Sequence, residues 1–146
     1  LTRALYKALR SSGMDVANYG TLFATIADVD KEKALPLIRR FYNLGFNIEG
    51  TKGTAEFLRQ NGIRTRYRAK LSEGSDEIFT ALRQGHINYV INTMDISQGD
   101  STRDGYEIRR CAVENNVSIF TSLETVQVLL DVLEEITLGV STIDAE

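Results

Sequence analysis

Cysteine and histidine are nearly absent from this chain of 146 residues, and their scarcity excludes several kinds of site. The single cysteine, Cys111, cannot form a disulfide within the chain. It also lacks the partners for a Cys/His metal site, because His86 is the only histidine. Cys111 falls on the inward face of a helical pattern and His86 follows Gly85 at the end of another. We therefore expect a core cysteine and an exposed histidine rather than a catalytic pair.

Long apolar runs are missing as well. No stretch approaches the length of a membrane span, and residues 1–9 are too polar for a signal peptide. A net charge of −3 and a pI near 5.3 give no overall signature of nucleic-acid or membrane binding. We therefore expect a cytoplasmic protein with neither nucleic acid nor membrane as a partner.

What is present is an ordinary globular composition, with 42% apolar and 25% charged residues, enough for one well-buried core. Residues 1–19 predict a short helix, with Leu1, Leu5 and Leu9 at helical spacing, followed by a linker. Residues 20–146 form the main domain, with a disordered tail expected from about residue 139. Because the chain opens without Met inside a helical pattern, we expect it to continue a preceding segment.

Short apolar runs alternate with helical patterns along the main domain. The runs are residues 21–26, 46–49, 63–71, 89–91 and 117–120. Runs of this length, bounded by turn residues, are typical of strands buried on both faces. The alternation predicts an α/β fold, a doubly wound parallel sheet with helices on both faces in three layers.

Three local details can be predicted from residue chemistry. Pro36 is tolerated only near a helix start, so the helix ending before Gly45 should begin at Glu32 or Lys33, which leaves Lys31 in a loop.

Residues 96–101 should be a polar loop. Basic residues alternate in the third run and should share one face of an edge strand, which discourages aggregation; they are Arg64, Arg66, Arg68 and Lys70.

Polar segments follow the strands at their carboxyl ends, where parallel α/β sheets bind ligands. These segments are residues 25–31, 50–54, 70–76 and 92–95. The second, Gly-Thr-Lys-Gly-Thr, brings backbone N–H groups and two hydroxyls to a helix start, an arrangement that favours phosphate. It is equally an ordinary capped turn. Together the segments predict a crevice for a phosphorylated small molecule with hydroxyl groups.

Two carboxylates, Asp76 and Asp95, stand near the same crevice and allow a second interpretation. Paired acids move protons when burial raises the pKa of one of them. The simpler interpretation makes Asp76 a helix cap and Asp95 a turn residue.

Five motifs follow one another along the chain: Gly-Thr-Lys-Gly-Thr at 50–54, Lys-Leu-Ser-Glu-Gly at 70–74, Val-Ile-Asn-Thr at 90–93, Asp-Gly-Tyr-Glu-Ile-Arg-Arg at 104–110 and Phe-Thr-Ser-Leu at 120–123. In this order they resemble the methylglyoxal-synthase-like domain, and more narrowly the version at the C-terminus of the carbamoyl-phosphate synthase large subunit. Residues 1–13 are similar to the segment that leaves the preceding ATP-binding half. The resemblance implies a five-stranded parallel sheet in the order 3-2-1-4-5.

The resemblance also implies a regulatory function. Such domains bind nucleotide effectors such as UMP, and in some members IMP or phosphoribosyl pyrophosphate, and so tune carbamoyl phosphate synthesis for pyrimidine and arginine pathways. The domain itself would need no cofactor, whereas ATP and Mg²⁺ serve the parent enzyme. Its partners would be the rest of the large subunit and the glutaminase small subunit, with oligomer contacts possible. The implied effector site consists of Lys31, Thr51, Thr54 and Lys70 for phosphate, with Thr25 nearby, and Asn92 and Thr93 for the sugar or base.

Two alternatives stay open. Methylglyoxal synthase, an enzyme of the same family, eliminates phosphate from dihydroxyacetone phosphate, and Asp76 and Asp95 fall where that enzyme has acidic residues. However, Ala27 occupies the place of one of its histidines, and Arg103 or its neighbours occupy the place of another, so its proton donors are missing. A scaffold or oligomerisation domain with an empty crevice is the other alternative.

Overall fold

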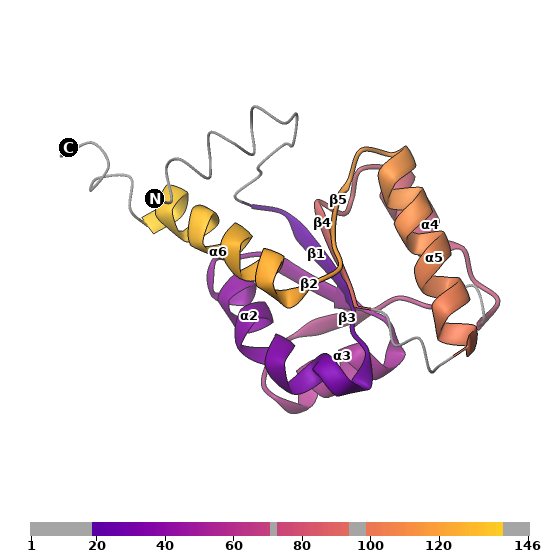
Figure 1. The fold of residues 1–146 in the computed structure, drawn as a ribbon, viewed down its shortest axis with the longest axis horizontal. Coiled ribbons are helices and arrows are strands. Elements are labelled where there is room, and N and C mark those ends of the chain that lie inside the picture. The colour runs from indigo at the N-terminus through magenta and orange to yellow at the C-terminus, as the bar shows by residue number, and fades with distance from the viewer. Residues whose placement is uncertain (1–18, 71–72, 94–98, 139–146) are drawn as a thin grey trace.

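The computed structural model of the protein describes residues 19–70, 73–93 and 99–138. Its centre is a parallel sheet of five strands in the order β3-β2-β1-β4-β5, which confirms the predicted fold class and strand order (Figure 1). The strands are β1 Thr21–Thr25, β2 Asn47–Gly50, β3 Thr65–Tyr67, β4 Tyr89–Asn92 and β5 Ser118–Phe120. All neighbours pair in parallel. Every strand therefore ends at the same edge of the sheet.

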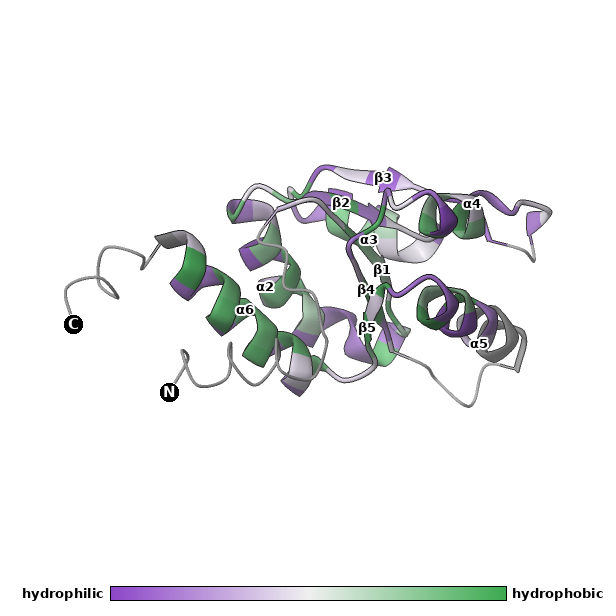
Figure 2. Ribbon diagram, turned by 90° about the horizontal axis from the view of Figure 1, so that it is seen from above, coloured by the Kyte–Doolittle hydropathy of each residue, from purple (hydrophilic) through white to green (hydrophobic). Residues whose placement is uncertain are grey.

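Helices cover both faces of the sheet, so the domain has three layers (Figure 2). One face carries α2 Lys31–Asn43, α3 Lys52–Gln60 and α6 Leu123–Leu138, and the other carries α4 Glu77–Arg83 and α5 Gly99–Glu114. A 3₁₀ turn, η1 Asp28–Asp30, joins β1 to α2. The order of the strands reverses direction between β1 and β4, the kind of point where such folds leave a crevice.

The two apolar layers differ in composition. Beneath α2 and α6 an aromatic chain crosses the sheet, with Phe41 packed edge-on to Phe46 at 5.2 Å between ring centroids, and Tyr89 6.2 Å from Phe120. Beneath α4 and α5 the core is mostly aliphatic and includes Cys111, which is 7% exposed. The sheet is thus buried on both faces, as the apolar runs predict.

The predicted start of α2 is wrong, because the helix begins at Lys31 and not at Glu32 or Lys33. The η1 turn leads directly into it, since the N–H of Lys31 donates to the carbonyl of Asp28. Pro36 therefore lies inside the helix, where its missing N–H leaves the carbonyl of Glu32 without its helical donor. Burial of Ala34, Ile38 and Phe41 offsets that single loss.

The third strand is shorter than predicted, and its basic residues do not share one face. Arg64 and Arg66 are exposed, but Arg68 is buried at 8% exposure. The alternation stops because β3 ends at Tyr67 and Arg68 turns inward to pair with Glu49. Its charge thus belongs to the interior and not to an exposed basic edge.

Two helix starts also differ from expectation. The predicted loop at residues 96–101 is wrong at its C-terminal part, because α5 begins at Gly99. Asp76 occupies the position before α4, but its side chain is exposed and makes no capping hydrogen bond. Ser75 Oγ instead accepts the Glu77 N–H at 3.2 Å. At α6, Ser122 caps the helix, because its Oγ accepts the Thr125 N–H at 3.3 Å.

Several predictions concern residues outside the described part of the chain. These are the helix and linker at residues 1–18, the tail from residue 139, and Asp95; the side chain of Arg103 is also outside it. Among the described helices, none combines the length and apolar character needed to cross a membrane.

The burial of Cys111 yields a simple chemical prediction. Desolvation raises the pKa of its thiol, so less of the reactive thiolate forms near neutral pH. We expect iodoacetamide at pH 7.5 to alkylate Cys111 at least about ten-fold more slowly in the folded chain than in the chain unfolded by urea. Mass spectrometry over time measures both rates, and equal rates would contradict the buried placement.

Candidate functional site

Loops from three adjacent strands meet at the carboxyl edge of the sheet. The N–H of Thr51, just after β2, donates to the carbonyl of Ala24 in β1 at 3.4 Å. On the other side of β1, the N–H of Thr93 donates to the carbonyl of Thr25 at 3.2 Å. The end of β1 is therefore held between the loops that follow β2 and β4, which brings three of the predicted threonines together.

The hydroxyls of Thr25, Thr51 and Thr54 form one cluster at this edge. Thr51 Oγ1 donates to Thr25 Oγ1 at 3.3 Å and lies 3.5 Å from Thr54 Oγ1. Thr54 Oγ1 in turn accepts the N–H of Ile26 at 3.0 Å. Each hydroxyl has one proton to donate, so Thr25 and Thr54 can donate to a ligand oxygen as they stand, whereas Thr51 would first have to release its bond to Thr25. The cluster ties the β1 loop to the start of α3.

Removal of the Thr54 hydroxyl tests this tie. In Thr54→Val a methyl group replaces Oγ1, which leaves the buried N–H of Ile26 without its acceptor. We expect the free energy of unfolding to fall by about 1–3 kcal/mol, the usual cost of an unsatisfied buried donor. Urea unfolding measures it, with Thr121→Val at an exposed position as control. Equal stability of the two variants would contradict the assigned role.

Asn92 and Thr93 are also used by the fold. Asn92 is 2% exposed, and its Nδ2 donates to the carbonyl of Gly105 in α5 at 2.8 Å. Thr93 Oγ1 accepts the N–H of Ala27 at 2.9 Å. These bonds fix the β4 loop against α5 and the β1 loop. A sugar or base contact would have to use the hydrogen-bonding capacity that remains: the oxygen and the second Nδ2 hydrogen of Asn92, and the hydroxyl proton of Thr93.

Lys31 and the start of α3 form the electrostatic centre of the edge. Thr51 stands at the cap position of α3, yet its side chain makes no capping hydrogen bond to the helix. The Lys31 side chain is 17% exposed and forms an ion pair with Asp28. A methyl group built on Gly53 would lie 3.3 Å from Lys31 Nζ. The ammonium group therefore lies against the first turn of α3, where N–H groups lack helical partners.

Glycine at position 50 allows the end of β2 to approach β1 closely. A methyl group built there would lie 3.0 Å from the carbonyl oxygen of Ala24 and 3.4 Å from Thr54 Cγ2. The β2 loop thus passes too close to β1 for any larger residue without a shift of backbone.

Lys70 lies beside this turn in a loop stabilised by Glu73. The Glu73 carboxylate accepts the Tyr67 hydroxyl at 2.6 Å and the Lys70 N–H at 3.0 Å. These two hydrogen bonds hold the pKa of Glu73 below its usual value, and the bond from Tyr67 has the larger effect. The charges of Lys70 and of Lys52, the first residue of α3, act in the same direction. The Lys70 loop and the start of α3 are therefore electrostatic neighbours.

The residues proposed for acid–base chemistry are not assembled at this edge. Asp76 is exposed, and Asp95 lies outside the described residues. His86 is exposed and precedes β4, so the only histidine of the chain lies at the amino edge of the sheet, opposite the threonine cluster. No group of three or more described His, Cys, Asp or Glu side chains is arranged to hold a metal ion.

A separate cleft of about 500 Å³ opens at the carboxyl edge, between the starts of α2 and α6. Thr93 is the one predicted site residue that lines it, beside Lys33, Thr121 and Ser122. It is thus distinct from the threonine cluster and Lys31.

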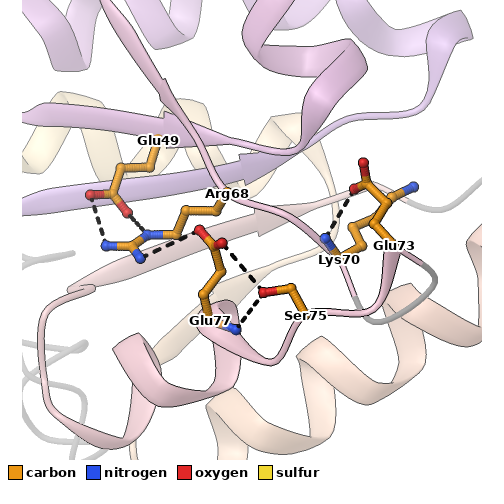
Figure 3. A network of polar contacts seen from close by, with 6 residues as sticks. All are labelled: Glu49, Arg68, Lys70, Glu73, Ser75 and Glu77. Carbon is orange, nitrogen blue, oxygen red and sulfur yellow. Dashed lines mark hydrogen bonds and ion pairs between the residues drawn. The ribbon is translucent and has the colours of Figure 1, made fainter.

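Sequence reasoning missed the buried ion pair of Glu49 and Arg68 (Figure 3). Arg68 donates to both carboxylate oxygens of Glu49, with Nη2 3.3 Å from Oε2. A signal was available, because Glu49 is a lone carboxylate in an apolar run that continues into Gly50. Such an acid needs a cation when it is buried.

A comparison with protein-family models matches residues 33–121 to the family described as the MGS-like domain. The match covers more than half of the chain. It includes Thr51, Thr54, Lys70, Asn92 and Thr93, whereas Thr25 and Lys31 lie just before it. The five-stranded sheet in the order 3-2-1-4-5 is consistent with that assignment. The chain belongs to the MGS-like domain family.

Proposed function

We propose that this chain is an effector-binding regulatory domain that holds the phosphate of a nucleotide at the start of α3. One observation carries the proposal: the Lys31 ammonium group lies against the first turn of α3, which no side chain caps. A helix start carries partial positive charge, so a cation there is unfavourable, and Asp28 is the carboxylate that offsets the charge of Lys31. A phosphate placed between the Lys31 ammonium group and the start of α3 would be attracted by both. It would also accept hydrogen bonds from the N–H groups of that first turn.

The surroundings supply what a phosphate needs. The hydroxyls of Thr51 and Thr54 lie in one cluster with Thr25, and Lys70 stands in the adjacent loop. Hydroxyl donors position phosphate oxygens and lysines act as point charges, which are the usual elements of phosphate recognition. Asn92 and Thr93 would meet the sugar or base at the neighbouring β4 loop.

We propose further that the parent protein is the carbamoyl-phosphate synthase large chain, as the resemblance of the ordered motifs implies. UMP is the first effector to test, followed by IMP and phosphoribosyl pyrophosphate. The domain would perform no catalysis itself, and ATP with Mg²⁺ would bind in the preceding part of the parent enzyme. Its macromolecular partners would be the rest of the large subunit and the glutaminase subunit. Regulation requires that the effector bind two states of the parent with different affinity, and couplings of about 1–3 kcal/mol are typical.

Calorimetric titration of the chain with each effector tests this function. The proposal predicts heat and a thermal shift with at least one of them at millimolar concentration or below. Absence of both with all three would reject it. Sedimentation then separates the scaffold alternative, which predicts association that no effector changes.

The enzymatic alternative has a direct assay. Incubation with dihydroxyacetone phosphate should yield no methylglyoxal above the uncatalysed background, because the proton donors of the synthase are absent: Ala27 is buried with its N–H bound to Thr93, and His86 lies at the opposite edge. Catalysed formation of methylglyoxal would overturn the regulatory proposal.

A further inference from the structure

Glu49 and Arg68 are the only buried charged residues among the side chains that the structure describes. Both side chains are 10% exposed, and the guanidinium group faces both carboxylate oxygens (Figure 3). A third group, Glu77 at the start of α4, lies with Oε1 3.9 Å from Arg68 Nη1. One arginine thus connects β2, the segment after β3, and α4.

The pair lies next to the two halves of the proposed phosphate site. Glu49 directly precedes Gly50, and the Arg68 N–H donates to the Gly50 carbonyl at 2.9 Å. Arg68 therefore holds β2 through its backbone and its side chain at once. Lys70 follows two residues later.

The Lys70 loop is closed by its own hydrogen bonds. The Lys70 carbonyl accepts the N–H groups of Glu73 at 3.0 Å and Ser75 at 3.2 Å, and Glu73 accepts from Lys70 and Tyr67. Ser75 and Glu77 continue the network into α4. These bonds hold Lys70, Glu73 and Ser75 together, and the Arg68 contacts with Glu49 and Gly50 join the segment just before Lys70 to β2.

Stability alone does not account for such a pair. Burial of two charges costs desolvation, and apolar residues of similar volume commonly replace a buried pair without loss of stability. An ion pair does, however, fix how its two partners are oriented, because a bidentate contact between guanidinium and carboxylate has one preferred geometry. We propose that Glu49 and Arg68 are positioning residues that hold the Lys70 loop against the Gly50–Thr54 turn; their effect on phosphate binding rests on the function proposed above.

The test is a double variant, Glu49→Leu with Arg68→Met, which keeps the net charge and the approximate volume. It is expected to fold with nearly the thermal midpoint of the wild type. The affinity for UMP should nevertheless fall by about ten-fold or more. Lys70→Met should weaken UMP binding by about ten-fold in the wild-type background and by less than about three-fold in the double variant, since coupled residues are not additive. The control, Arg110→Met with Glu114→Gln, removes an exposed pair with no change in net charge and should bind UMP as the wild type does.

Hydrogen exchange provides a readout that needs no ligand. The amide of residue 68, which bonds to Gly50, should exchange at least about ten-fold faster in the double variant, with the Val90 amide of β4 unchanged as reference. Unchanged protection at residue 68 would overturn the proposal, and so would wild-type UMP affinity or an unaltered effect of Lys70→Met in a folded double variant. If the wild type binds no nucleotide, the proposed function fails, and the exchange at residue 68 still decides whether the pair positions the loop.

Discussion

The single variant Arg68→Met should lose about 3–5 kcal/mol of unfolding free energy, because it leaves a buried carboxylate without its cation. Glu49, in β2, is 8% exposed, and Arg68 donates the hydrogen bonds to both of its carboxylate oxygens. The same substitution leaves Glu77 without its one cation in the described network. For a domain of this size, the melting temperature should fall by on the order of 10 °C or more.

Urea unfolding followed by circular dichroism measures this loss, and two comparisons give it meaning. Arg66→Met removes an exposed arginine from the preceding strand and should change stability by less than about 0.5 kcal/mol. Glu49→Leu added to Arg68→Met should recover most of the loss, because no buried charge then remains unpaired. A loss below about 1 kcal/mol in Arg68→Met would show that the pair is not buried as described.

The second large effect concerns ligand affinity. Lys31→Met should weaken UMP binding by about 1.5–3 kcal/mol, or about 10- to 150-fold, the range for removal of a charged hydrogen-bond donor. Stability without ligand should change little, since the Asp28 partner of the lost ion pair is 73% exposed and the substitution also removes a cation from a helix start. Calorimetric titration measures the affinity, and thermal unfolding without ligand measures the stability.

Lys33→Met is the matched control, because Lys33 is an exposed lysine of the same helix and lines the cleft between α2 and α6, which shares only Thr93 with the proposed effector site. It should leave UMP affinity unchanged within about two-fold. If Lys33→Met weakens binding as much as Lys31→Met or more, the effector occupies that cleft and the α3 site is wrong.

The fold could be predicted where burial determines the pattern. Strands covered on both faces have continuous apolar runs, and glycines mark the ends of the helices between them, so β1 and β4 were predicted to within two residues. Strand order did not follow from these runs, since periodicity says nothing about which strands are neighbours. It came from the resemblance to the methylglyoxal-synthase-like domain.

The errors arose where tertiary contacts outweigh local preference. Pro36 argued for a later start of α2, but burial of three apolar side chains and the preceding η1 turn support the longer helix. Alternation placed Arg68 on a solvent face, but the strand ended first and a carboxylate 19 residues earlier paired with it. The candidate site followed the same rule. That Thr25, Thr51, Thr54 and Thr93 lie at or just after strand ends was visible in the sequence, whereas the approach of Lys31 to Gly53 depends on how α2 packs beside α3.

The most direct test of the account observes the start of α3 during titration. Two-dimensional ¹H–¹⁵N NMR spectra of the labelled chain should be recorded with UMP and, separately, with uridine. The account predicts that UMP shifts the amides of Lys52, Gly53 and Thr54 in a saturable way and that uridine, which lacks the phosphate, does not. Equal shifts with uridine, or UMP shifts confined to Thr121, Ser122 and the rest of the separate cleft, would contradict it.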